Sequence, residues 1–147
     1  MRTFSASHPL TASPAQAWAL LSDVCRWPQW LPTVRRVEQL AGTTLAPGAR
    51  YKIWQPQLAP AVWVVTEVQP GRSFSWESRS PGVKVLAEHV LSGTAPEGPS
   101  VLLRISFSGL LSGLVARLYG GLTQQYLVRE AQALNAALRA AGRPGTG

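Results

Sequence analysis

The strongest constraint on the fold is a stretch of thirty residues near the end of the chain, 112–141, that contains no proline. At about 100° per residue, its hydrophobic side chains fall first on one helical face and then on another. The first set is Leu111, Leu114, Val115, Leu118, Leu122 and Tyr126, and the second is Leu127, Ala131, Leu134 and Leu138. The change of face follows Gly120 and Gly121. We therefore predict one long helix, from roughly Ser112 to Arg139, that either bends there or has different neighbours at its two ends.

The middle of the chain follows a different pattern. Between residues 34 and 108, hydrophobic and polar residues alternate with a period of two, and turn residues recur at short intervals. Candidate strands lie at 33–40, 47–56, 61–68, 73–79, 83–91 and 101–109, after a first strand at 2–10. The sequence Gln69-Pro70-Gly71-Arg72 is typical of a tight hairpin turn, so its two flanking strands are expected to be antiparallel neighbours.

Two short helices are predicted between the first strand and the second. Ser13 is a suitable N-cap, and Pro14 suits the first turn of the helix that follows. Asp23 predicts the start of a second short helix that runs through Trp27 and Trp30. Helices that are separated in sequence from a run of antiparallel strands predict an α+β fold.

Length and composition limit the kind of protein this is. The chain has 147 residues, about the size of one domain, and we expect a single domain over 1–141 with a flexible tail at 142–147. Cys25 is the only cysteine, which excludes an intrachain disulfide. The N-terminus lacks the apolar region of a signal peptide, and no apolar run approaches the ~20 residues of a membrane span. We therefore expect a soluble, cytoplasmic protein with no transmembrane segment.

The net charge is +7, from 14 basic and 7 acidic residues. Such a balance can indicate nucleic acid or an anionic membrane surface as a partner. The arginines are spread along the chain, however, and only Arg35 and Arg36 are adjacent. The charge pattern therefore does not favour nucleic-acid binding.

Four segments carry a resemblance to a known family: "SPAQAWALLSDVCRWPQWLP", "PGARYKIWQP", "VVTEVQPGRSFSWES" and "LTQQYLVREAQAL". With the order of elements, they make the chain similar to the polyketide cyclase/dehydrase-like branch of the START and Bet v 1-like superfamily, from about Thr3 to Leu138. The resemblance implies a helix-grip fold, in which a curved, seven-stranded antiparallel sheet wraps a long C-terminal helix and two short helices cap one end. It also implies a hydrophobic cavity. Members carry lipids, sterols, polyketides or plant hormones, and some are aromatases or cyclases.

Alternation along the strands assigns side chains to the inner face of the sheet. In the strand 61–68, an outward Glu67 predicts that Val62, Val64, Thr66 and Val68 point inward and that Trp63 points outward. Trp63 would then lie near Trp54 on the outer face, which suggests a possible homodimer. The predicted ligand-binding residues are Trp27, Trp30, Leu31, Tyr51, Ile53, Thr66, Phe74, Trp76, His89, Phe107, Leu118, Leu122 and Tyr126.

Trp27 and Trp30 have two interpretations. In relatives, the short helices and their turn cap the sheet where ligands enter, so the resemblance implies that both tryptophans lie at the mouth of a cavity. Alternatively, both are packed plugs that fix the short helices onto the sheet. A cavity wall is also a packed wall, so the two interpretations do not exclude each other.

Catalytic motifs are absent from the sequence. It has no Cys-x-x-Cys, His-x-x-x-His, Gly-x-Ser-x-Gly or phosphate-binding glycine loop, and we expect neither a metal nor a cofactor. His89 on an inner face is more often a hydrogen-bonded core residue than a catalyst. The sequence favours a non-catalytic binder of a hydrophobic or aromatic small molecule, such as a lipid or a polyketide. Two alternatives stay open: an aromatase/cyclase-type enzyme guided by cavity shape, and a protein-interaction module with a filled cavity.

Overall fold

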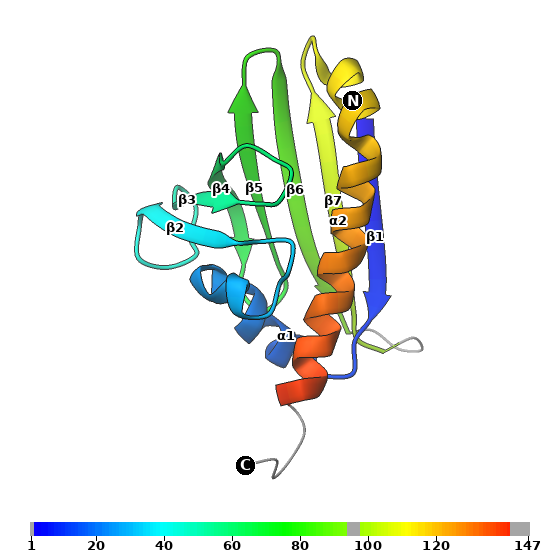
Figure 1. Cartoon of the computed structure of the whole chain (residues 1–147). Coiled ribbons are helices and arrows are strands. Elements are labelled where there is room, and N and C mark those ends of the chain that lie inside the picture. The colour runs from blue at the N-terminus through cyan, green and yellow to red at the C-terminus, as the bar shows by residue number, and fades with distance from the viewer. Residues whose placement is uncertain (1, 94–97, 142–147) are drawn as a thin grey trace.

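In the computed structural model, residues 2–93 and 98–141 are described, and within them seven antiparallel strands form one sheet in the order β1-β7-β6-β5-β4-β3-β2 (Figure 1). The strands are β1 (Arg2–Pro9), β2 (Arg36–Ala41), β3 (Arg50–Trp54), β4 (Ala61–Gln69), β5 (Ser73–Ser80), β6 (Val83–Ser92) and β7 (Ser100–Ser108). The helices are α1 (Pro14–Leu21), the 3₁₀ helix η1 (Val24–Gln29) and α2 (Ser112–Ala141). The tail predicted for 142–147 lies outside the described residues.

The long helix α2 packs on the sheet mainly through β1 and β7 (Figure 1). Its first turns lie beside the β5–β6 and β7–α2 turns, and α1 lies near its last turns. This arrangement of a curved sheet, a gripped helix and short helices at one end is the predicted helix-grip α+β fold. None of the helices in residues 2–93 and 98–141 is long and apolar enough to cross a membrane.

Local sequence signals explain several boundaries. The Ser13 side chain accepts a hydrogen bond from the Gln16 amide and the Gln16 side chain accepts one from the Ser13 amide, so α1 begins with a capping box. The predicted hairpin turn is confirmed: the Arg72 amide donates to the Gln69 carbonyl at 2.9 Å, and Gly71 has a φ of +77°. A positive φ at this position suits glycine, which follows Pro70 as in a type II turn.

The second short helix differs from its prediction. Asp23 stands at the N-terminus of η1, but its carboxylate makes no capping hydrogen bond there and instead pairs with Arg26 at 3.4 Å. Pro28 lies within η1, and the helix ends at Gln29, so Trp30 follows it. A short 3₁₀ turn tolerates this proline more easily than a longer α-helix would.

The first apolar stripe predicted for α2 is split: Val115, Leu122 and Tyr126 face inward, whereas the three leucines nearer the start of the helix do not. Leu111, Leu114 and Leu118 are 47%, 55% and 67% exposed, whereas the small residues Ala116 and Gly120 are buried. A Cβ on Gly120 would lie 2.8 Å from the Phe4 ring of β1, so the glycine allows the helix to approach the strand closely. The second stripe, Leu127, Ala131, Leu134 and Leu138, is buried as predicted.

The predicted parity of β4 is wrong over its first half. The register with β5 shifts between Val65 and Glu67, which marks a bulge at Thr66. A bulge places two residues opposite one and reverses the side-chain alternation on either side of it. Trp63 and Val65 therefore point inward, where Val62 and Val64 were expected. Thr66 is exposed, and its hydroxyl donates to the Ser75 carbonyl at 3.2 Å.

Candidate ligand-binding site

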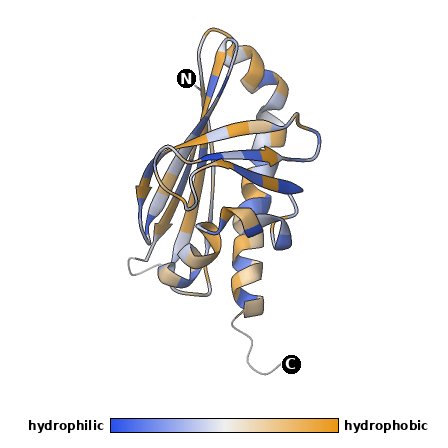
Figure 2. Cartoon of the chain, turned by 90° about the vertical axis from the view of Figure 1, so that its left-hand side faces the viewer, coloured by the Kyte–Doolittle hydropathy of each residue, from blue (hydrophilic) through white to orange (hydrophobic). Residues whose placement is uncertain are grey.

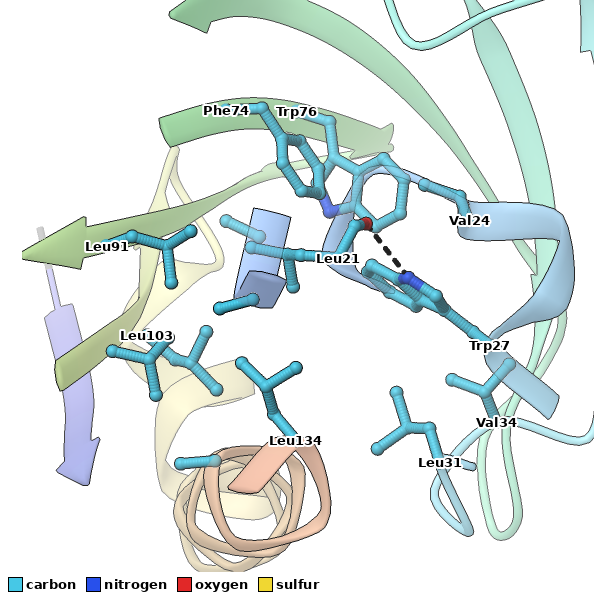
Figure 3. Packing of buried hydrophobic residues seen from close by; sticks show 14 of the residues in the cluster. Leu21, Val24, Trp27, Leu31, Val34, Phe74, Trp76, Leu91, Leu103 and Leu134 are labelled. Atoms are coloured by element: carbon cyan, nitrogen blue, oxygen red, sulfur yellow. Dashed lines mark hydrogen bonds between the residues drawn. The ribbon is translucent and has the colours of Figure 1, made fainter. Parts of the chain in front are cut away.

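An aromatic cluster fills the end of the sheet that α1 and η1 cover. Trp27 is 2% exposed and packs against Phe74, Trp76 and the edge of Trp30, with ring centroids 5.3 to 6.3 Å apart. Its indole Nε1 donates to the Leu21 carbonyl at 3.0 Å, as Figure 3 shows. Trp27 thus fixes η1 to α1 and to the sheet. Of the two interpretations of this residue, the packed plug describes its position.

His89 extends this cluster toward α2. Its ring stacks on Phe74 with centroids 4.1 Å apart, and its Nδ1 lies 3.3 Å from the Phe74 carbonyl oxygen. On its other side, Nε2 lies 3.6 Å from Oε1 of Glu130, whose side chain is only 15% exposed. That oxygen has no hydrogen-bond partner among the described residues. A buried carboxylate oxygen without a donor costs stability.

A small chamber of about 50 Å³ lies beside this pair. Trp27, Trp76, His89, Leu127 and Glu130 line it, together with side chains of β3, β4, β6 and β7. This volume is enough for a water molecule but far too small for an organic ligand.

A larger cavity of about 440 Å³ opens on the side away from α1. It lies between the first half of α2, strands β5 to β7 and the loop that joins β3 to β4. Its wall is mostly apolar or aromatic: Leu58, Ala59, Ala61, Trp63, Val83, Val85, Ile105, Phe107, Val115, Tyr119, Leu122, Tyr126 and Leu127. Polar groups come from Gln55, Ser78, Ser80, Thr123 and Glu130. Glu130 is the one charged residue of this wall among the residues described, and it also borders the small chamber.

The structure divides the thirteen predicted site residues into groups. Phe107, Leu122 and Tyr126 line the large cavity, and the Tyr126 hydroxyl donates to the Pro56 carbonyl, which holds the β3–β4 loop against α2. Trp27, Ile53, Trp76 and His89 border the small chamber. Leu31 and Phe74 are buried in the core, and Trp30 packs beside it. Tyr51 lies at a separate depression.

Two predicted site residues do not face the space between sheet and helix. Thr66 is turned outward by the bulge in β4. Leu118 is 67% exposed, because the helix presents Gly120 to β1 and so turns the leucine stripe toward solvent. Neither lines either cavity.

Sequence reasoning missed most of the large cavity's wall, and the two missed residues that matter most are Trp63 and Glu130. Trp63 was assigned to the outer face, but it lines both cavities and packs on Trp76 with centroids 5.7 Å apart. The suggested homodimer rested on Trp63 lying outside beside Trp54, so that argument no longer holds. A signal for Glu130 was present, since it stands three residues after Leu127 and four before Leu134 and thus shares their helical face.

The separate depression, of about 470 Å³, lies between η1, β2, β3 and the loop after β2. Tyr51 and Cys25 line it. Burial, with smaller contributions from Cys25 and Asp23, raises the pKa of Tyr51 to about 12. Desolvation, followed by the charge of Asp23, also raises the pKa of the Cys25 thiol. A thiol with a raised pKa is a poor nucleophile at neutral pH.

No group of three or more histidine, cysteine or acidic side chains is placed to hold a metal ion in the part of the chain that the structure describes.

A curved antiparallel sheet that grips a C-terminal helix, with a cavity between them, defines the helix-grip class of proteins. The chain belongs to the family described as "Polyketide cyclase / dehydrase and lipid transport", whose model matches residues 1–142. A search of curated protein sequences found no match.

Solved structures share the fold at low sequence identity. The Zhui aromatase/cyclase from Streptomyces sp. R1128 has a TM-score of 0.78 and 15% identity, covering 99% of this chain and 98% of that chain. A protein from Thermus thermophilus has a TM-score of 0.75 and 17% identity, covering 97% and 100%. The di-domain ARO/CYC protein StfQ of the steffimycin biosynthetic pathway has a TM-score of 0.75 and 14% identity, covering 96% of this chain and 52% of that chain. At these identities, the similarity establishes the fold.

Proposed function

We propose that the protein binds a hydrophobic or aromatic small molecule in the large cavity between β5–β7 and the first half of α2. The cavity itself carries this proposal. Its volume of about 440 Å³ falls in the range of about 300–1,000 Å³ that is usual for small-molecule sites. Its wall is apolar and aromatic with few polar groups, which is the usual composition of such sites. The open cavity also argues against the alternative of a filled, purely structural core.

The wall suggests how a ligand is oriented. Trp63, Phe107 and Tyr119 offer flat aromatic surfaces, whereas Glu130 and Gln55 lie where the cavity approaches the small chamber. An apolar ring system would lie among the aromatic side chains. A hydroxyl or amine at its inner end would donate to the Glu130 carboxylate, which borders the cavity. The ligand class that fits is therefore a flat or elongated apolar molecule with a hydrogen-bond donor at one end.

A pair of matched variants tests this proposal. Val85→Trp places an indole in the cavity, whereas Val62→Trp places one on the outer face of β4, where Val62 is 37% exposed. Calorimetric titration with a fatty acid, a sterol and a hydroxylated fused-ring aromatic should find at least one binder. We expect Val85→Trp to weaken that binder at least tenfold and Val62→Trp to leave it unchanged. Equal binding by both variants, or no binding by the parent protein, contradicts the proposal.

The His89–Glu130 pair favours a second candidate, a cyclase-type enzyme. Cyclisation by an aldol reaction needs a proton removed from carbon and one delivered to a carbonyl oxygen, and an imidazole beside a carboxylate can perform both transfers. Glu130 borders the space that a substrate would occupy. Incubation with a linear poly-β-ketone, followed by product analysis, tests this role. We expect His89→Ala and Glu130→Gln to abolish cyclisation while retaining binding. A parent protein that binds the poly-β-ketone without accelerating its cyclisation is a binder only.

A further inference from the structure

Most of the exposed large hydrophobic side chains of the described chain lie at the end where α2 begins. Four leucines form it, Leu110, Leu111, Leu114 and Leu118, with exposed fractions of 99%, 47%, 55% and 67%. We call this group the leucine tip. The hydropathy colouring of Figure 2 shows hydrophobic residues at the start of α2, at the end of the molecule away from α1. Isolated exposed leucines are ordinary, but four within nine residues at one end of a molecule indicate a contact surface.

The leucine tip is held outward by a rigid structure. The Leu111 amide donates to the Gly82 carbonyl at 2.8 Å, which ties the β7–α2 turn to the β5–β6 turn. A Cβ on Gly109 would lie 2.6 Å from the Gly82 carbonyl oxygen, and Gly109 has a φ of +107°. The two turns therefore approach so closely that only glycine fits. Leu110 projects from this joined pair of turns and packs against almost nothing.

The charge around the leucine tip is basic. Arg117 lies in the first turns of α2, is exposed, and makes no ion pair within the described residues. Arg2 begins β1 at the same end. Arg79 and Lys84 flank the β5–β6 turn and both contact Glu77, the one acidic residue on the described strands at this end. Two basic groups thus share one carboxylate, and the end as a whole carries excess positive charge.

We propose that the leucine tip inserts into the surface of an anionic lipid bilayer, with the surrounding basic residues on the lipid headgroups. A projecting apolar tip with a basic surround fits this partner, because a bilayer accepts apolar side chains without matching their shape and attracts lysine and arginine. The surface also continues into the cavity: Val115 and Tyr119, on the same helical turns, line its wall. Docking would bring the mouth of the cavity to the membrane. The membrane-docking proposal does not depend on which ligand the cavity takes.

Co-sedimentation with lipid vesicles tests this inference. The full chain is mixed with vesicles of phosphatidylcholine alone and of phosphatidylcholine with about 30% phosphatidylglycerol, an anionic content at which basic residues contribute strongly. We expect binding to the anionic vesicles and weakening with added salt. Leu110→Glu/Leu114→Glu should reduce that binding at least tenfold. Leu40→Glu, at a leucine on β2 that is 47% exposed, serves as the control and should bind like the parent.

A second pair of variants examines the charges. Arg117→Ala removes a basic residue beside the leucine tip, and Arg139→Ala removes one at the opposite end of the same helix. We expect roughly fivefold weaker binding from Arg117→Ala, as for one surface arginine near an anionic bilayer, and no change from Arg139→Ala. All substituted side chains are exposed, so circular dichroism should show parent-like folding. The inference is overturned if the parent protein does not bind the anionic vesicles. It is also overturned if Leu40→Glu weakens binding as much as Leu110→Glu/Leu114→Glu does and Arg139→Ala weakens it as much as Arg117→Ala does. A dimer in light scattering that Leu110→Glu/Leu114→Glu dissociates would also overturn it, since a second copy would then be the partner.

Discussion

Nε2 of His89, on β6, lies 3.6 Å from Oε1 of Glu130, on α2, and the two groups join the sheet to the helix at the inner end of the large cavity. The distance exceeds that of a charge-assisted hydrogen bond, about 2.7–2.9 Å. Glu130 is thus a largely buried carboxylate with an imperfect partner. Such groups cost stability and are retained where a ligand or a reaction uses them.

Glu130→Gln tests that cost. The amide replaces the carboxylate with a neutral group of nearly the same shape, so the change in stability measures the cost of burying the carboxylate. We expect the free energy of unfolding at pH 7, measured in urea, to rise by about 1 kcal/mol. Glu88→Gln breaks a more exposed ion pair with Arg104 and should change the free energy of unfolding by less than about 1 kcal/mol. A loss of more than about 2 kcal/mol in Glu130→Gln would show that the His89 contact stabilises the fold.

Trp27→Ala should lower the stability of the fold more than it affects ligand binding. The side chain is 2% exposed, contacts an aromatic cluster and donates to the Leu21 carbonyl. We expect a loss of about 3–5 kcal/mol in chemical unfolding. Trp54→Ala, which removes a half-buried ring under Arg36 and Lys52, should cost about 1 kcal/mol. Similar losses in the two variants would contradict the role of Trp27 as the plug of this end.

Adjacent glycines in α2 should respond oppositely to alanine. Gly121 faces open space, so Gly121→Ala should stabilise the protein by about 1 kcal/mol through helix propensity. Gly120→Ala places a methyl group 2.8 Å from the Phe4 ring and should destabilise it by about 1–2 kcal/mol. Thermal unfolding of the two variants measures the difference. Equal stabilisation by both would mean that α2 does not lie this close to β1.

The sequence predicted the order of elements well because local signals determined it. The Ser13 cap, the Pro70-Gly71 turn and the proline-free final helix each depend on neighbouring residues alone. The buried stripe that includes Leu134 was also recognisable, since its period matches a helix.

The errors arose where distant contacts decide the outcome. Alternation along β4 could not reveal the bulge at Thr66, because a bulge is a property of the pairing with β5. The leucines before Leu122 looked like a core stripe, but the fit of Gly120 against Phe4 sets the rotation of α2. Glu130 was overlooked because a charged residue is usually exposed.

Tyr51 makes stability depend on pH in alkaline solution. Its pKa is raised to about 12 in the folded protein, against about 10 for an unperturbed tyrosine. The folded state therefore holds the phenolic proton more tightly, so stability is fully present below pH 10 and is lost as pH rises toward 12. We expect the free energy of unfolding to fall by an amount on the order of 2 kcal/mol over this pH range. Tyr51→Phe should abolish this fall. Tyr119→Phe, at a tyrosine that is 44% exposed, should retain it. Identical pH profiles for both variants would contradict this assignment.

The most direct measurement of the central claim is an isotope-filtered nuclear Overhauser experiment on methyl-labelled protein with a bound hydroxylated fused-ring aromatic such as 2-naphthol. Ligand binding between the sheet and α2 predicts contacts from the rings to the methyl groups of Val85, Val115 and Leu122, and none to Leu21 in the packed end. Contacts restricted to surface methyl groups such as those of Leu40, or the absence of any contact at saturating ligand, would contradict it.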